Sequence, residues 1–241
     1  MNKVLVTLSG GVDSLVCLAL AIKKYGIDNV ETISFNYGQK NANELKAVKR
    51  IAKHYGVYNK IIYLKNLFFD EKCSLLNISK NDIPLEDYSE QIKQVRENKR
   101  VSTNVPFRNA IMLSVCVSYA MSKNINIIYY GIHNEGELAR NLYPDCSEEF
   151  NDAFKLLTSI GTEKTVKIVA PLVDLTKKEI IKIGIKLNVP FSKTWTCYNN
   201  KEFSCGKCTA CKDRLEAFKK CKLEDPLIYK EQIKRRINKW W

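Results

Sequence analysis

One six-residue segment limits the fold more than any other part of the chain, because it lies between a predicted strand and a predicted helix. Residues 3–8 are typical of a short β-strand, residues 9–14 read SGGVDS, and residues 13–25 favour a helix that ends at Gly26. Glycines at such a junction let an anion approach the backbone, and the free N–H groups at the helix start point towards it. The segment therefore predicts a phosphate-binding turn; a plain glycine turn with a helix cap is the alternative.

This turn differs from two common nucleotide-binding signatures. The chain has neither the Gly-Lys-Ser/Thr of a Walker A loop nor the G-x-G-x-x-G of a dinucleotide fingerprint. The hydroxyl groups of Ser9 and Ser14 are suited to donate hydrogen bonds to phosphate oxygens. Asp13 would repel a phosphate unless it caps the helix or holds Mg²⁺.

Strand and helix signals alternate through the rest of the first 190 residues. Strands are predicted at residues 30–35, 60–64, 125–130 and 166–169, and helices at residues 43–55, 109–122, 147–159 and 176–187. This alternation predicts an α/β fold with a doubly wound parallel sheet. Residues 66–104 are polar and weakly periodic, so we expect a functional lid or a partly disordered segment there.

Four of the nine cysteines are grouped near the end of the chain. Cys197, Cys205, Cys208 and Cys211 offer four thiolates, which suit a tetrahedral Zn²⁺ with no open position for water. The pattern therefore predicts a structural zinc site; an iron–sulfur cluster or free thiols are the alternatives. We expect residues 1–190 to form the catalytic domain and residues 191–241 a zinc-binding helical appendage packed on it.

Composition excludes several classes of protein. The 241 residues are 45% hydrophobic and 27% charged, which is ordinary for a globular chain, and apolar runs such as residues 15–22 are too short to cross a membrane. No secretion signal is recognisable, so a soluble cytoplasmic protein is expected. Residues 176–241 carry +10 of the net charge of +13. A solvated basic surface and contact with a polyanion are both open readings of that excess.

The SGGVDS segment resembles the PP-loop of the adenine nucleotide α-hydrolase-like ATP pyrophosphatases. Members of that superfamily cleave ATP between its α- and β-phosphates and adenylate a carboxyl or carbonyl oxygen.

Several further segments resemble one family, the 7-cyano-7-deazaguanine synthases of queuosine biosynthesis. They read SFNYGQK at residues 34–40, NVPFRN at 104–109, YPDC at 143–146, PLVDLTKKEI at 171–180 and TCY at 196–198. Such enzymes convert 7-carboxy-7-deazaguanine to the nitrile with ATP and ammonia, through an acyl-adenylate, an amide and a second adenylation. The resemblance also suggests Mg²⁺ on the phosphates and a homodimer.

The resemblance implies a role for particular residues of this chain. The catalytic set would be Ser9, Asp13, Ser14 and Arg108. The ATP contacts would be Leu8, Ser9, Gly10, Gly11, Val12, Asp13, Ser14, Phe35 and Gly131. The substrate contacts would be Tyr37, Gln39, Phe107, Arg108, Asn109, Tyr143 and Asp145. The zinc ligands would be Cys197, Cys205, Cys208 and Cys211.

Each polar substrate contact also has a structural alternative. Arg108 is suited to a bidentate bond with a carboxylate, or to an ordinary ion pair. Asn109 and Asp145 are suited to read the guanine-like edge, or to cap a helix and organise a turn. For Cys146 of the YPDC segment, a place as a buried small hydrophobic residue is the alternative to a place in the site.

The sequence departs from the family pattern near the expected substrate pocket. Residues 132–142 lack the family's D-x-S-G signature and are longer, Ser147 replaces an Arg, and Asn36 and Lys40 replace an Asp and an Arg. A second reading is therefore kept: a similar ligase of antiviral operons of the CBASS type, which joins the adenylated deazaguanine to a protein amine. An RNA-modifying PP-loop enzyme and a nucleic-acid-binding zinc module would explain the basic tail but leave NVPFRN and YPDC unexplained.

Overall fold

The computed structural model describes residues 2–86, 90–91, 93, 100–133, 142–199 and 201–237. A sheet of five parallel strands occupies its centre in the order β3-β2-β1-β4-β5. The strands are β1 (Val4–Thr7), β2 (Val30–Asn36), β3 (Asn59–Tyr63), β4 (Ile127–Tyr129) and β5 (Lys167–Val169). The predicted doubly wound α/β fold is confirmed.

The strand order places the expected phosphate loop at the switch point of the sheet. Val4 of β1 pairs with Val30 of β2 on one side and with Ile127 of β4 on the other. The chain thus winds in opposite directions from β1, and in open α/β sheets ligands bind beyond the carboxyl ends of the strands at such a point. The loops that follow β1 and β4 meet there.

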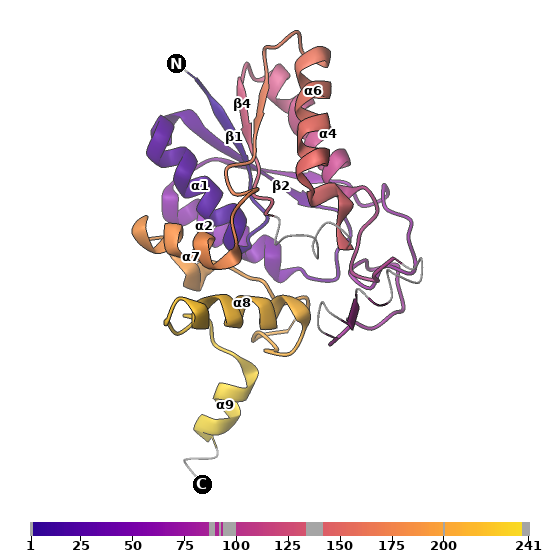
Figure 1. Ribbon diagram of the computed structural model, residues 1–241, viewed down its shortest axis with the longest axis vertical. Coiled ribbons are helices and arrows are strands. Elements are labelled where there is room, and N and C mark those ends of the chain that lie inside the picture. Colours follow the sequence, from indigo (N-terminus) through magenta and orange to yellow (C-terminus); the bar gives the residue numbers. More distant parts are fainter. Residues whose placement is uncertain are drawn as a thin grey trace.

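Helices cover both faces of the sheet (Figure 1). One face packs against α1 (Val12–Tyr25), α2 (Asn43–Tyr55) and α7 (Lys177–Lys186), and the other against α4 (Arg108–Ser122) and α6 (Glu148–Gly161). The central strand β1 serves both layers, because neighbouring side chains of a strand point to opposite faces. Val4 and Val6 belong to the core under α1, whereas Leu5 belongs to the core under α4.

Short elements and two C-terminal helices complete the chain. Three 3₁₀ turns span Ile27–Asn29, Pro144–Cys146 and Phe191–Lys193, and they are followed by α8 (Thr209–Lys220) and α9 (Lys230–Ile237). Ala217 and Phe218 of α8 are buried in the same core as α1. Among the described residues, no helix is both long and apolar enough to span a membrane.

The sequence located every strand and helix of residues 1–190 named above to within two residues at each end, the usual uncertainty of frayed ends. The capping box at α7 is present: Thr176 Oγ1 accepts from the Glu179 amide, and Glu179 Oε2 accepts from the Thr176 amide. Part of the described portion of residues 66–104 is anchored to the sheet, because Phe68, Cys73 and Leu76 are buried in the core under α4.

Two sequence features lie outside the described residues. They are the greater part of the divergent segment 132–142 and the terminal pair Trp240 and Trp241, for which the sequence leaves an interface anchor and a frayed end equally open.

Candidate active site

The SGGVDS segment forms a tight turn between β1 and α1. Ser9 Oγ donates to Ser14 Oγ at 3.1 Å and accepts a hydrogen bond from the Gly11 amide at 3.4 Å. The first residue of α1 is Val12, so the free N–H groups of that helix lie directly at this turn. The turn has the geometry of an anion-binding helix start.

Gly10 allows two other segments to pack against the turn. Its φ is +90°, and a Cβ there would lie 2.6 Å from the backbone oxygen of Glu44. Its own carbonyl oxygen accepts a hydrogen bond from the Trp195 amide at 2.8 Å. A side chain at this position would displace α2 from the turn.

Asp13 makes a buried ion pair. Lys177 Nζ, at the start of α7, lies 2.7 and 2.9 Å from its two carboxylate oxygens, and His133 Nδ1 lies 3.5 Å from one of them. Burial alone would raise the pKa of Asp13, but Lys177 and then His133 outweigh it and hold the pKa below its usual value. No side-chain capping hydrogen bond is present at the start of α1 in the described residues, and both Asp13 oxygens accept from Lys177.

Gly131 follows β4 and touches the turn from the other side. A Cβ at Gly131 would lie 3.0 Å from the backbone C and O of Asp13 and from the amide nitrogen of Ser14. The backbone of the phosphate turn therefore rests directly on the end of β4.

A cavity of about 410 Å³ opens beside the turn, within the usual size range of small-molecule sites. The predicted residues that line it are Leu8, Ser9, Gly11, Asp13, Ser14, Phe35, Tyr37, Gln39, Arg108, Asn109, Gly131 and Tyr143. The predicted residues outside its lining are Gly10, Val12, Phe107 and Asp145. Phe107 is 66% exposed and packs edge-to-face on Phe150.

Arg108, at the start of α4, brings a positive charge to the cavity from a second wall. Its Nη1 donates to the hydroxyl of Tyr37 at 3.2 Å, and its guanidinium lies over the Tyr37 ring, 5.6 Å from the centroid. Burial raises the pKa of Tyr37 to about 12, so this hydroxyl stays protonated at neutral pH. The guanidinium of Arg108 is charged, as arginine always is in proteins. The described residues do not place Arg108 in an ordinary ion pair, which was one of its two alternatives.

Glu44, near the start of α2, lines the same cavity. The Asn41 side-chain amide donates to its Oε1 at 3.4 Å. Burial raises the pKa of Glu44 to about 7, although the nearby Arg108 charge and the Asn41 hydrogen bond lower it. This carboxyl group was not singled out by the sequence.

Asn109 and Asp145 bind each other. The Asn109 amide donates to Asp145 Oδ2 and its side-chain Nδ2 to the Asp145 carbonyl, both at 2.9 Å. Asp145 thus caps α4 from a segment 36 residues away. Asn109 Nδ2 also lies 3.3 Å from Cys146 Sγ, a thiol whose pKa burial raises to about 12.

Gln39 and Tyr143 are likewise held by neighbours. Gln39 is buried, accepts from the Tyr37 amide at 2.9 Å and donates to the Phe35 carbonyl at 3.2 Å, so its side chain fixes its own turn. The Tyr143 hydroxyl lies 2.7 Å from Thr103 Oγ1.

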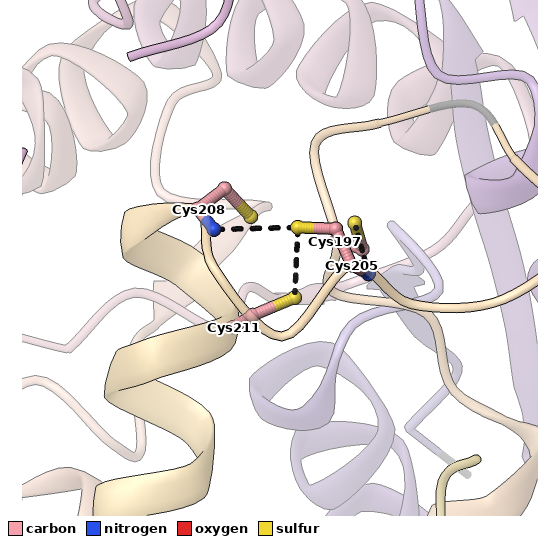
Figure 2. Close-up of side chains that lie close together, drawn as sticks. All are labelled: Cys197, Cys205, Cys208 and Cys211. Carbon is pink, nitrogen blue, oxygen red and sulfur yellow. Dashed lines mark hydrogen bonds between the residues drawn. The ribbon is translucent and has the colours of Figure 1, made fainter. Parts of the chain in front are cut away.

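The four clustered cysteines come together beside α8 (Figure 2). Their sulfur atoms all lie within 4.8 Å of one another, and Cys205 Sγ is 3.9 Å from Cys211 Sγ. Four Zn–S bonds of about 2.3 Å in a tetrahedron would separate the sulfurs by about 3.8 Å, so the cluster fits a single metal ion. The ligands of a multi-iron cluster bind different irons and lie farther apart.

The backbone around the cysteines is suited to thiolates. The amides of Lys207 and Cys208 point at Cys205 Sγ from 3.4 and 3.3 Å, and Gly206, between Cys205 and Lys207, has a φ of +72°. This left-handed backbone conformation lets Gly206 make the tight turn between the ligands.

The cysteine cluster is tied to the phosphate turn. The Cys197 carbonyl accepts from Asn41 Nδ2 at 2.6 Å and from Trp195 Nε1 at 2.8 Å, while the Trp195 backbone holds Gly10. Arg214 of α8, fully buried, binds Asp225 and Thr194 and so fixes the segment that leads to Trp195.

Sequence reasoning missed several polar residues of the cavity. Glu44, Thr103, Lys177 and Asp213 all line it without having been assigned there. His133 lines it too, as its place on the loop after a strand suggested. Lys177 lies inside the quoted PLVDLTKKEI segment, which was the one available signal for it.

Comparison with known proteins gives a consistent result. The model of the family described as queuosine biosynthesis protein QueC matches residues 3–222. A relative from Marinomonas sp., named 7-cyano-7-deazaguanine synthase, is 36% identical over 228 residues, covering 95% of this chain and 98% of the relative. Another of that name from Caldicellulosiruptor saccharolyticus is 39% identical over 232 residues, covering 96% and 97%.

Among solved structures, the U34-tRNA thiolase NcsA from Methanococcus maripaludis is 19% identical to this chain, with a TM-score of 0.49. The match covers 92% of this chain and 68% of the thiolase chain. That score is too low to define the fold, which rests on the sheet order instead.

Proposed function

Because the chain belongs to the QueC family of queuosine biosynthesis proteins, we propose that it converts 7-carboxy-7-deazaguanine and ammonia into 7-cyano-7-deazaguanine at the expense of ATP. The observation that carries this proposal is the pairing, within one cavity of about 410 Å³, of an anion-binding turn with the guanidinium of Arg108. The reaction must bring two anions together, a carboxylate and a triphosphate, and the two walls supply one binding group for each.

The phosphate turn holds ATP in this proposal. The N–H groups of residues 9–14 and the Ser9 and Ser14 hydroxyls bind the phosphates, and Leu8, Phe35 and Gly131 contact the rest of the nucleotide. Mg²⁺ accompanies the phosphates of ATP rather than Asp13, whose two oxygens already face Lys177.

Arg108 holds the acid. A guanidinium donates two parallel hydrogen bonds to a carboxylate, and the bond from Arg108 to Tyr37 fixes its orientation. The planar deazaguanine ring stacks among the aromatic side chains of Tyr37 and Tyr143, which line the cavity. Asn109, Asp145, Gln39 and Phe107 shape this wall, the first two through their mutual hydrogen bonds.

The chemistry proceeds in three displacements and a final elimination. A carboxylate oxygen attacks the α-phosphorus of ATP, and pyrophosphate leaves as the acyl-adenylate forms. Ammonia attacks the carbonyl carbon, and AMP leaves as the amide forms. The amide oxygen attacks the α-phosphorus of a second ATP, and pyrophosphate leaves as the adenylated amide forms. In a final elimination the carbon–oxygen bond to AMP breaks and the carbon–nitrogen triple bond forms, with two protons lost over these last two steps.

The cysteine cluster holds Zn²⁺ in a structural site in this proposal. Four thiolates close the tetrahedral shell, so the ion stabilises the segment that positions Trp195 and Gly10 rather than reacting with substrate. Residues 191–241 form the corresponding appendage on the catalytic domain of residues 1–190.

The test is to incubate the protein with ATP, Mg²⁺ and 7-carboxy-7-deazaguanine, with and without ammonium, and to identify the products by mass spectrometry. AMP, pyrophosphate and, with ammonium, the nitrile are expected. Absence of acid-dependent AMP would exclude the substrate. Light scattering at micromolar concentration tests the homodimer, and a monomeric mass would exclude it.

A second candidate follows from the divergent segment 132–142. If that segment admits a protein amine in place of ammonia, the reaction ends at an amide conjugate with, for example, an N-terminus. AMP formation without nitrile, together with a protein that gains the mass of the acyl group, would favour this antiviral-type ligase.

A further inference from the structure

Glu44 lies where the phosphate turn and the Arg108 wall meet. Its backbone oxygen packs against Gly10, and its side chain lines the cavity together with Ser9 and Arg108. A carboxyl group at this position is near the place where an acyl-adenylate, bound between the two walls, would react. This inference rests on the proposed function.

The environment of Glu44 differs from that of Asp13. Both oxygens of Asp13 accept from Lys177, whereas the Glu44 carboxyl accepts one long hydrogen bond from Asn41 among the described residues. The other charged or titratable groups that face Glu44 are Arg108 and Tyr37. Glu44 is therefore oriented but not neutralised by a direct ion pair in the described part of the chain.

The protonation of Glu44 changes near neutral pH. Burial raises its pKa to about 7, so both the acid and the carboxylate are populated under ordinary conditions. A proton acceptor works best when its pKa lies near the working pH. Asp13, whose pKa is lowered, cannot serve in the same way.

We infer that Glu44 accepts a proton from the incoming ammonium ion and so delivers ammonia to the acyl-adenylate. Ammonium has no free electron pair and cannot attack carbon. Its N–H proton passes to the Glu44 carboxylate, and the nitrogen of the resulting ammonia forms the carbon–nitrogen bond. The carbon–oxygen bond to AMP breaks, and a second proton from nitrogen leaves with the AMP phosphate. The Glu44 proton then returns to solvent.

The variant Glu44→Gln keeps the shape of the side chain and removes the proton acceptor, and Glu71→Gln, at an exposed position, is its matched control. Acid-dependent pyrophosphate release in the first turnover should stay close to wild type in both. The ammonium-dependent step should slow by on the order of 10²–10⁴-fold in Glu44→Gln at pH 7 and stay unchanged in Glu71→Gln.

The pH profile separates a proton acceptor from a merely structural residue. In the wild type, the rate at limiting ammonium should rise to a plateau above about pH 7, because ammonium itself is the substrate and Glu44 is then ionised. In Glu44→Gln the rate at limiting ammonium should rise about tenfold per pH unit up to the pKa of ammonium, since only free ammonia reacts. Hydroxylamine, neutral at pH 7, should restore the variant to near the wild-type rate.

Two failures are distinguishable. If the wild type forms no AMP with the acid, the proposed function fails. If adenylation is intact but Glu44→Gln keeps the wild-type ammonium rate and plateau, or is slowed equally with hydroxylamine, the assignment of Glu44 is overturned.

Discussion

Lys177 Nζ lies 2.7 and 2.9 Å from the two carboxylate oxygens of Asp13, so one buried ion pair joins the start of α7 to the first turn of α1. The Lys177 side chain is 8% exposed and that of Asp13 21%. The pair holds two segments 164 residues apart, at the point where the phosphate turn enters its helix. The turn is therefore fixed by the tertiary fold as well as by its glycines.

Lys177→Met should destabilise the fold by about 3–5 kcal/mol at pH 7, because it leaves the Asp13 carboxylate buried without its main partner. In the wild type the pKa of Asp13 is lowered, so its contribution is present above the unfolded value of about 3.9 and is lost as pH falls through the folded value. Without Lys177, burial raises that pKa, and the carboxylate then favours the unfolded state above about pH 4.

Urea unfolding at pH 4 and pH 7 measures this effect. The deficit of Lys177→Met should be larger at pH 7, and adding Asp13→Asn should recover much of it. An equal deficit at both pH values would show that the loss comes from packing and not from the Asp13 charge.

Gly131→Ala should disturb ATP binding. The new Cβ would lie 3.0 Å from backbone atoms of Asp13 and Ser14, and backbone cannot move aside as a side-chain tip can. We expect a loss of about 1–3 kcal/mol of stability and a raised KM for ATP. Gly161→Ala is the control, because a Cβ there has no neighbour within 4 Å. Equal KM values for the two variants would contradict the close contact.

Arg108→Ala should weaken binding of the acid. A charge-assisted hydrogen bond contributes about 1.5–3 kcal/mol, which corresponds to a rise of about 10- to 100-fold in the KM for 7-carboxy-7-deazaguanine. The KM for ATP should change little. Tyr37→Phe removes only the bond that orients Arg108 and should have the smaller effect. Steady-state kinetics with each substrate varied in turn measures both KM values. A rise confined to the KM for ATP would contradict the assignment of Arg108 to the acid.

Removing the metal should destabilise the fold rather than abolish catalysis selectively. Cys208→Ser removes one of four clustered ligands, and the neighbouring Cys197 carbonyl anchors Trp195 and Asn41. We expect zinc content to fall well below one per chain and the Tm to drop. Metal analysis and thermal unfolding measure both. Loss of zinc with an unchanged Tm and abolished turnover would mean that the site is not structural.

The sequence was sufficient for features encoded in contiguous residues. The phosphate turn and the cysteine cluster each depend on a short spacing, and the sheet on alternating strand and helix signals, so local patterns identify them. The Lys177–Asp13 pair could not be read in this way, because no local pattern specifies which distant side chain meets the turn.

Two further residues show why the rest of the site was hidden. Glu44 resembles an ordinary charge in the first turn of an amphipathic helix, and only the packing of α2 against Gly10 places it in the cavity. Asp145 has the residue type of a ligand-binding group, yet its carboxylate caps α4, since that helix start needs an acceptor.

The most direct measurement of the central claim uses 7-carboxy-7-deazaguanine labelled with ¹⁸O in both carboxyl oxygens, together with ATP, Mg²⁺ and ammonium. Each adenylation leaves one oxygen of the acid on AMP, so the account predicts two ¹⁸O-labelled AMP molecules for every nitrile formed. Unlabelled AMP, or labelled acid recovered intact without AMP, would contradict it.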